Sequence, residues 1–167
     1  KGTKAEDATD GCEACAFGKF SSALGATAES TCNACSAGKR GSPTVVGTAD
    51  AHCTVCDAGM FQSDPAKTEC ANCGVGTFAA STGAALCNAC VAGQYTNAEK
   101  QLSCESCGEG QFQSSASKTE CEDCTAGQFS TTTGQSECTS CAVGRYRIGA
   151  KGTKAEDATD GCEACAF

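Results

Sequence analysis

The chain has few of the residues that build a large hydrophobic core. Its 167 residues include no Trp, two Tyr, seven Phe and one Met. Burying one aromatic ring stabilises a fold by roughly 1.5 to 3 kcal/mol, whereas ordering a stretch of 17 residues costs about 25 kcal/mol. Packing alone therefore cannot hold short segments of this chain in place, and we expect a thin core that needs covalent support.

Long apolar runs are also absent. The sequence contains no run of eighteen apolar residues, the length needed to span a membrane. The start of the chain does not resemble a signal peptide. The sequence does not begin with Met, so we expect a part of a longer secreted precursor whose targeting signals lie elsewhere, with no membrane span of its own.

Basic residues are in deficit. The formal net charge is −8, from 12 Lys and Arg against 20 Asp and Glu. An acidic chain of this kind repels nucleic acid and anionic membrane surfaces, so we expect neither as a partner. We interpret the carboxylates as a solvated surface and predict no cofactor and no metal.

Cysteine, by contrast, is abundant, with 18 residues in the chain. That share is typical of a disulfide scaffold outside the reducing cytosol. Every cysteine belongs to a Cys-x-x-Cys pair. The nine pairs are Cys12/Cys15, Cys32/Cys35, Cys53/Cys56, Cys70/Cys73, Cys87/Cys90, Cys104/Cys107, Cys121/Cys124, Cys138/Cys141 and Cys162/Cys165.

The chain also repeats itself on a longer scale. Lys151–Phe167 copies Lys1–Phe17 letter for letter, which sets a period of 150 residues. We therefore predict that residues 1–150 form one unit of eight tandem modules, beginning at the first cysteine of each of the first eight pairs. Residues 151–167 would start the next identical unit, so the sequence favours a repetitive polymer.

Each module reads C-x-x-C-x-x-G-x-[F/Y], followed by a polar stretch of variable length. The recurrent Gly predicts a positive-φ turn or a close contact between chain segments. We interpret the recurrent ring as a stacking core between modules, with Arg40 the one exception. Two very short strands per module, joined by a tight turn, are expected. The predicted fold is thus a small disulfide-rich repeat protein, an elongated solenoid of β-hairpin-like modules, mostly irregular and with little or no helix.

Three interpretations of the cysteine pairs remain open. Zinc could bind four cysteines at this spacing, and a redox role for C-x-x-C is a third reading. The favoured one is a ladder in which the second cysteine of each pair bonds to the first of the next, with about 3 kcal/mol per loop. It comprises Cys15–Cys32, Cys35–Cys53, Cys56–Cys70, Cys73–Cys87, Cys90–Cys104, Cys107–Cys121, Cys124–Cys138 and Cys141–Cys162.

That ladder leaves Cys12 and Cys165 to bond with neighbouring units. No catalytic residue is predicted, and we interpret His52, beside Cys53, as a loop residue because sequence adjacency supplies no orienting group. Small, polar contexts suggest O-linked glycans. The candidate sites are Ser42, Thr44, Thr131, Thr132 and Thr133.

The module at Cys87–Tyr95, followed by Cys104, resembles the cysteine-rich repeats of ephrin-receptor and tumour-necrosis-factor-receptor ectodomains. The resemblance implies the same ladder pairing, because in those families the cysteine before the Gly and the aromatic bonds to the next cysteine onward. Large extracellular proteins of protists, including fibre-forming proteins of flagellar hairs (mastigonemes), are similar in using long arrays of such repeats.

We therefore predict a structural protein that forms the shaft of an extracellular filament or surface appendage and whose main partner is itself. The alternative is a receptor or adhesin stalk that binds a protein ligand through the long loops at Gly41–His52 and Arg147–Gly161. An enzyme is not expected, since the sequence offers no nucleophile with a base and an oxyanion site.

Overall fold

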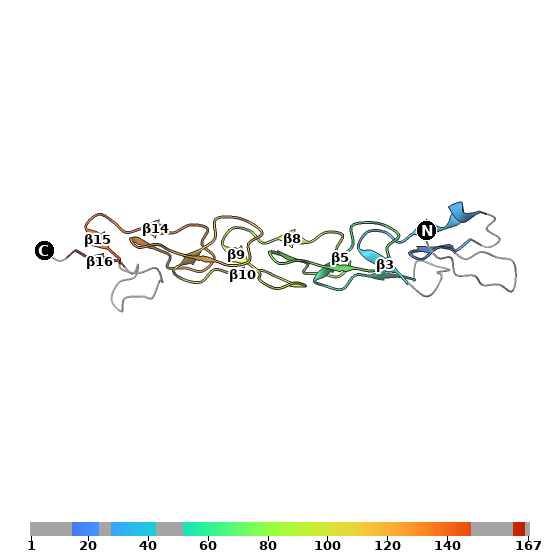
Figure 1. The fold of residues 1–167 in the computed structure, drawn as a ribbon, viewed down its shortest axis with the longest axis horizontal. Coiled ribbons are helices and arrows are strands. Elements are labelled where there is room, and N and C mark those ends of the chain that lie inside the picture. The colour runs from blue at the N-terminus through green and yellow to red at the C-terminus, as the bar shows by residue number, and fades with distance from the viewer. Residues whose placement is uncertain (1–14, 24–27, 43–51, 148–161, 166–167) are drawn as a thin grey trace. The chain divides into compact units, whose positions relative to one another are not determined.

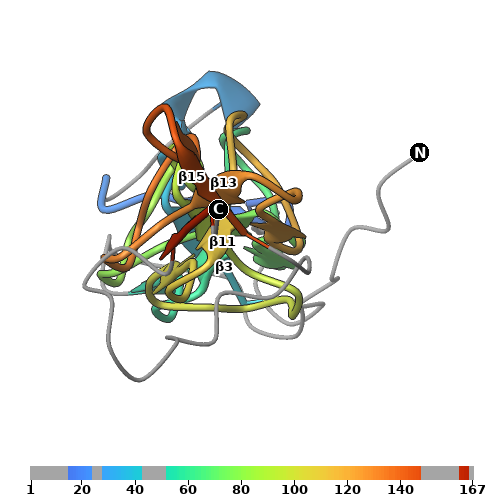
Figure 2. The same cartoon turned by 90° about the vertical axis from the view of Figure 1, so that its left-hand side faces the viewer.

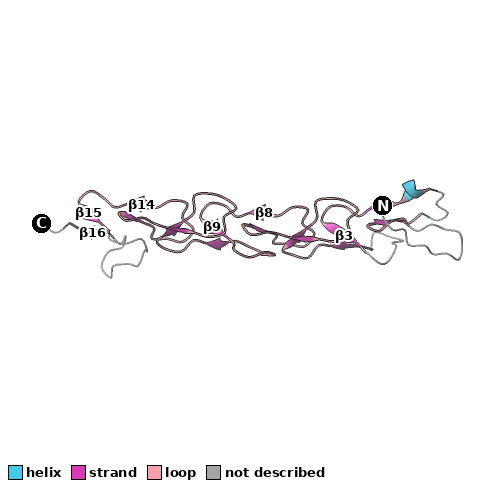
Figure 3. Cartoon of the chain, in the orientation of Figure 1, coloured by secondary structure: helices cyan, strands magenta, loops and turns pink. Residues whose placement is uncertain are grey.

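A computed structural model describes residues 15–23, 28–42, 52–147 and 162–165 of the chain. The described part is almost entirely β-strand, turn and loop, with one short 3-10 helix, η1 (Glu29–Thr31), as Figure 3 shows. Strands are only two or three residues long because each is bounded by a cysteine or by the turn glycine. The expected fold class, a disulfide-rich repeat of short hairpins with little helix, is confirmed.

Eight two-stranded antiparallel sheets follow one another along the chain (Figure 1). In every sheet, the strand that carries the aromatic position pairs with the strand between the two cysteines of the next module. The pairs are β1 (Lys19–Phe20) with β2 (Asn33–Ala34), β3 (Lys39–Gly41) with β4 (Cys53–Val55), β5 (Met60–Phe61) with β6 (Ala71–Asn72), β7 (Thr77–Phe78) with β8 (Asn88–Ala89), β9 (Gln94–Tyr95) with β10 (Glu105–Ser106), β11 (Gln111–Phe112) with β12 (Glu122–Asp123), β13 (Gln128–Phe129) with β14 (Thr139–Ser140), and β15 (Arg145–Tyr146) with β16 (Glu163–Ala164).

A tight turn joins the two strands of each module, as predicted, but those two strands do not pair with each other. In the third module the Met60 amide donates to the Asp57 carbonyl at 3.0 Å, and Gly59 has a φ of +80°. A positive φ at the third turn residue is the requirement of a type II turn. The turn sends β4 back to the preceding module and β5 on to the next, so every sheet spans a module boundary.

The contacts between residues divide the chain into two compact units. Unit 1 comprises Lys1–Cys73 and Ala79–Cys87, and unit 2 comprises Gly74–Phe78 and Asn88–Phe167. Within unit 2, the end view in Figure 2 places the labelled strands β11, β13 and β15 near the centre, with loops outside them. The strands themselves are not the core, because β11 and β13 are half-buried and β10, β12, β14 and β15 are exposed.

The buried core consists mainly of cysteine. The second cysteines of six interior pairs are almost fully buried, with an exposed fraction of 0 to 1%, whereas Cys141 is half-buried. The six are Cys35, Cys56, Cys73, Cys90, Cys107 and Cys124. The aromatic rings are only half-buried and Tyr146 is 37% exposed, so the interpretation of the rings as the inter-module core is wrong.

The position after the ring is buried in six of the eight modules. Gly41, Ala79, Thr96, Gln113, Ser130 and Arg147 are buried there, whereas Ser21 and Gln62 are half-buried. Successive residues of a strand point to opposite faces, so a half-exposed ring places its successor inside. This position carries a polar side chain in six of the eight modules, so its burial is not evident from a pattern of apolar residues.

Candidate functional site: the bonded junction between modules

The disulfides of the described residues tie each module to the next. The eight bonds are Cys15–Cys32, Cys35–Cys53, Cys56–Cys70, Cys73–Cys87, Cys90–Cys104, Cys107–Cys121, Cys124–Cys138 and Cys141–Cys162. The residues joined are 14 to 21 apart in sequence. No bond encloses another, so the loop-closure contributions of about 3 kcal/mol each are expected to be nearly independent.

Backbone hydrogen bonds reinforce each junction. Between the modules that start at Cys87 and Cys104, the Cys107 amide donates to the Gly93 carbonyl at 2.9 Å. The Gly93 amide donates to the Gln113 carbonyl at 2.7 Å, and the Ser117 amide donates to the Cys90 carbonyl at 2.8 Å. Each junction therefore combines one covalent bond with several backbone bonds that shield the buried cysteine from water.

The first of these bonds recurs without exception. In all eight junctions, the amide of a second cysteine donates to the carbonyl of the preceding turn glycine, at 2.8 to 3.0 Å. The junction after Tyr146 follows the same rule, because the Cys165 amide donates to the Gly144 carbonyl at 2.9 Å. The copied segment at the end of the sequence therefore joins its predecessor in the manner of every other module.

The turn glycines satisfy two demands at once. Gly93 has a φ of +82°, and a Cβ there would overlap the backbone carbonyl of Gly134, two modules further on. Gly18, Gly38 and Gly76 likewise meet a loop carbonyl two modules on. At these four glycines a Cβ is excluded by conformation and by space, whereas at Gly127 and Gly144 only the positive φ opposes it. Both roles proposed for the recurrent Gly are confirmed, and the contact extends the reach of each module to its second neighbour.

The loops contain a second positive-φ position that the sequence analysis missed. It lies at Ala66, Gly83, Lys100, Ser117 and Gly134, which are spaced by 17 residues. At four of the five positions, Lys100 excepted, the amide donates to a second-cysteine carbonyl of the preceding module, as Ser117 does to Cys90. Only two of the five are Gly, so the residue type gave no signal, although the constant 17-residue spacing could have done so.

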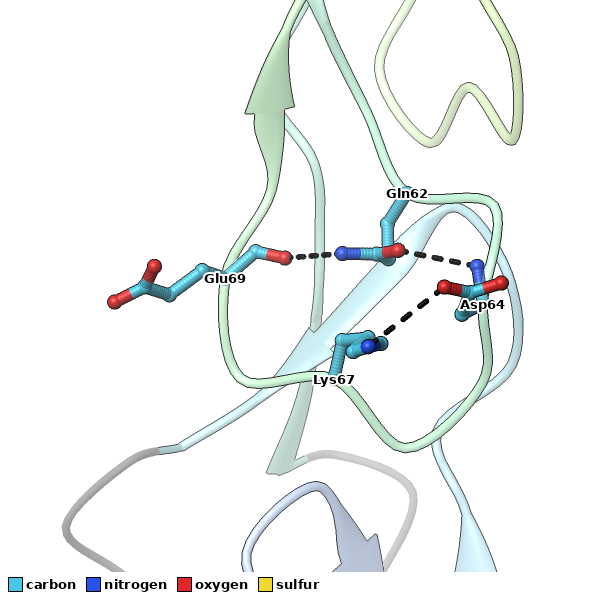
Figure 4. A network of polar contacts seen from close by, with 4 residues as sticks. All are labelled: Gln62, Asp64, Lys67 and Glu69. Atoms are coloured by element: carbon cyan, nitrogen blue, oxygen red, sulfur yellow. Dashed lines mark hydrogen bonds and ion pairs between the residues drawn. The ribbon is translucent and has the colours of Figure 1, made fainter.

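Two loops are closed by a glutamine side chain. The Gln62 Nε2 donates to the Glu69 carbonyl at 2.6 Å, and the Asp64 amide donates to the Gln62 Oε1 at 3.0 Å. Figure 4 shows this network, together with a Lys67–Asp64 ion pair at 3.7 Å. Gln113 makes the same two bonds in its own loop, to the Glu120 carbonyl at 2.9 Å and from the Ser115 amide at 3.1 Å.

The two tyrosines make matching cross-strand pairs. The Tyr95 hydroxyl donates to Glu105 at 2.9 Å, and the Tyr146 hydroxyl donates to Glu163 at 3.1 Å. In each case the hydrogen bond to the carboxylate, followed by its negative charge, raises the pKa of the tyrosine above its usual value near 10. The second pair joins the last module of the 150-residue unit to Glu163 of the copied segment.

The remaining predicted residues are dispersed. Cys12 and Thr44 lie outside the described residues. So do residues 43–51 and 148–161, which make up most of the two long loops. Cys165 is exposed and is not in a disulfide. Thr131, Thr132 and Thr133 are exposed, and the Thr132 hydroxyl accepts a bond from Gln135 at 2.6 Å. Ser42 and His52 are half-buried.

The described cysteines other than Cys165 are all disulfide-bonded, and a bonded sulfur is not a thiolate ligand for zinc. Residues 15–23, 28–42, 52–147 and 162–165 contain no group of three or more His, Cys, Asp and Glu side chains that could hold a metal ion. A search of the same residues found no helix with the length and apolar character needed to cross a membrane.

The fold and its junctions define a disulfide-laddered array of small cysteine-rich modules, a class that occurs in extracellular proteins. Residues 41–85 and 76–119 match the family model described as tyrosine-protein kinase ephrin type A/B receptor-like, which confirms the resemblance to ephrin-receptor-like repeats. Repeats of this family are receptor-like and not enzymatic, and with the many disulfides they indicate an extracellular or secreted protein. No curated protein matches the chain.

Proposed function

We propose that this chain forms the shaft of an extracellular filament or surface appendage, such as a flagellar hair. One observation carries the proposal: every described junction, including the one that enters the copied segment, uses the same disulfide and the same cysteine-to-glycine backbone bond. An array with one rule for all its junctions can extend without limit, and its covalent links would bear tension.

The exact repetition of Lys1–Phe17 at Lys151–Phe167 supports the same proposal. A polymer of 150-residue units would place Cys12 of one unit opposite the counterpart of Cys141 in the unit before it. Cys165 would bond forward to the counterpart of Cys32. Non-reducing peptide mapping of the native protein is expected to find both links and O-linked glycans on the exposed threonines of 131–133.

Electron microscopy of the native material tests the proposal directly. We expect fibres with an axial repeat set by the 150-residue unit, and reduction of the disulfides should dissolve that repeat. Discrete particles of one size, with no fibres, would contradict a shaft.

The second candidate is a receptor or adhesin stalk, and the family match favours it because the matched repeats are receptor-like. Ligand contacts would then lie on the long loops at 41–52 and 147–161. Replacing each loop by the polar stretch of a 17-residue module should abolish ligand binding and leave the disulfide map unchanged. Shortened loops without any loss of binding would exclude this assignment of the ligand site.

A further inference from the structure

The modules differ from one another with a period of three. Gln113 follows Gln62 by 51 residues, which is three modules of 17, and the two side chains make identical loop bonds. Each stands in the sequence Phe-Gln-Ser-x-x-x-Lys-Thr-Glu. We call the loops of residues 62–69 and 113–120 the KTE loops.

The other modules follow the same period. The tyrosines Tyr95 and Tyr146 are 51 residues apart, as are the positive-φ glycines Gly83 and Gly134. Arg40 occupies the ring position in the second module, and Tyr95 occupies it in the fifth, three modules later. Arg40 therefore falls in the phase that carries tyrosine, and both side chains combine an apolar part with a polar end. The exception in the aromatic series is accounted for by its phase.

The internal geometry of the array does not select such a period. The bond from a second cysteine to the preceding turn glycine is the same at every described junction, so this rule does not distinguish one module in three. A period of three in side-chain chemistry requires an influence that distinguishes every third module. A neighbouring molecule that contacts only some of the loops is such an influence.

We propose that the KTE loops are the contact surface for a second copy of this chain. The inference rests on the proposed shaft function and adds a lateral partner to it. Each loop displays an exposed lysine and an exposed glutamate two residues apart, at Lys67 and Glu69 and at Lys118 and Glu120. Two facing KTE loops can therefore pair lysine with glutamate in both directions, which is the self-complementary pattern of a two-fold interface.

A groove beside the second KTE loop fits this contact. It has a volume of about 530 Å³ and is lined by Tyr95, Asn97, Gln111, Thr119, Glu120 and Cys121. The lining is polar, and its one ionised group is the Glu120 carboxylate, so the groove suits a lysine side chain from a facing loop. The Gln113 bonds fix the loop backbone before contact, which reduces the entropy lost on association.

Single exposed ion pairs contribute little, so the contact depends on repetition. A fibre that repeats the KTE loop along its length multiplies a weak pair into a stable lateral contact. The 167-residue chain would therefore associate only weakly through this surface, whereas long arrays would bundle.

The test uses charge reversal in the full chain. A K67E/K118E variant and an E69K/E120K variant should each self-associate about tenfold more weakly than the parent in sedimentation at low salt. Mixing the two variants should restore association, because each then faces its opposite charge. K19E/K100E changes net charge equally at exposed or half-exposed positions outside the KTE loops and serves as the control. An unchanged disulfide map verifies folding in every variant.

Carbodiimide cross-linking of mixed isotope-labelled and unlabelled parent chains should join Lys67 or Lys118 of one copy to Glu69 or Glu120 of the other. Parent chains that stay monomeric at millimolar concentration would overturn the proposal, as would a K19E/K100E effect equal to that of K67E/K118E. Native fibres that keep their 150-residue axial repeat but show no such cross-links would overturn the lateral contact alone. Absence of fibres would instead contradict the shaft.

Discussion

Each module has two parts that obey different rules. The frame comprises the cysteines, the turn glycine and the short strands beside them, and the loop is the polar stretch that follows. Frame positions, such as Cys90, Gly93 and Cys107, are buried and hydrogen-bonded in the same way from module to module. Loop positions are mostly exposed and vary in length and chemistry, with a period of three that the cysteines and the turn glycine lack. The difference teaches that the fold is specified by the cysteines, the turn glycine and the spacing between them, whereas the loops are free to encode contacts.

Removing one frame disulfide should have the largest effect. The bond Cys107–Cys121 closes the β11–β12 pair, and replacing both cysteines by Ser should destabilise this region by about 3 kcal/mol. Hydrogen exchange followed by mass spectrometry would detect it as lost protection in residues 107–124 with little change near Cys35–Cys53. Uniform loss across the array would show that the junctions are coupled and not independent.

The two roles of the turn glycine can be separated by a matched pair. Gly93→Ala suffers both the positive φ and the overlap with the Gly134 carbonyl, whereas Gly127, with a φ of +79°, has open space where its Cβ would lie. Gly127→Ala should cost about 1 to 2 kcal/mol from conformation alone, and Gly93→Ala clearly more. Thermal unfolding of the two variants measures the difference. Equal losses would mean that the second-neighbour contact adds nothing.

The loop positive-φ position offers a smaller effect of opposite sign. Ser117 has a φ of 59°, and Ser117→Gly should stabilise the array by up to about 1 kcal/mol because it relieves that strain, less the entropy that Gly adds to the unfolded chain. Gly134→Ser at the equivalent site should destabilise it by a similar amount. Denaturant midpoints provide the comparison, and a shift of the same sign in both variants would refute the equivalence of the two sites.

Much of the frame was predictable from residue spacing. The cysteine pairs, the recurrent Gly and the short strands are all visible as a repeat, because each has one residue type at one phase. The buried position after the ring escaped notice because Thr96, Gln113 and Ser130 are polar and are buried through bonds to their own loops. Which strands pair also could not be read from a single module, since every sheet crosses a module boundary.

The period of three was present in the sequence but had no meaning until the loops were seen. The FQS and KTE letters at Phe61–Glu69 and Phe112–Glu120 can be aligned by eye. Only the matching glutamine bonds show that the shared letters build the same loop. The conformation of a loop depends on the hydrogen bonds within it, and these bonds are not evident from the residue letters alone.

The smallest expected effect concerns the Tyr95–Glu105 pair, which bridges two frame strands. The hydrogen bond to the Glu105 carboxylate raises the pKa of Tyr95 above its usual value. Because the folded-state pKa is the higher one, the contribution of the pair to stability is complete below pH 10 and is lost as the pH rises through the folded-state value. For an exposed pair we expect about 0.2 to 1 kcal/mol.

Spectroscopy can isolate this pair because the chain has only two tyrosines. In a Tyr146→Phe variant, the tyrosinate absorbance reports Tyr95 alone, and its midpoint should lie above that of the unfolded chain. Adding Glu105→Gln should lower the midpoint, since it removes both the carboxylate acceptor and its charge. A midpoint that does not respond to Glu105→Gln would mean that the strand frame, and not the cross-strand pair, sets the titration of Tyr95.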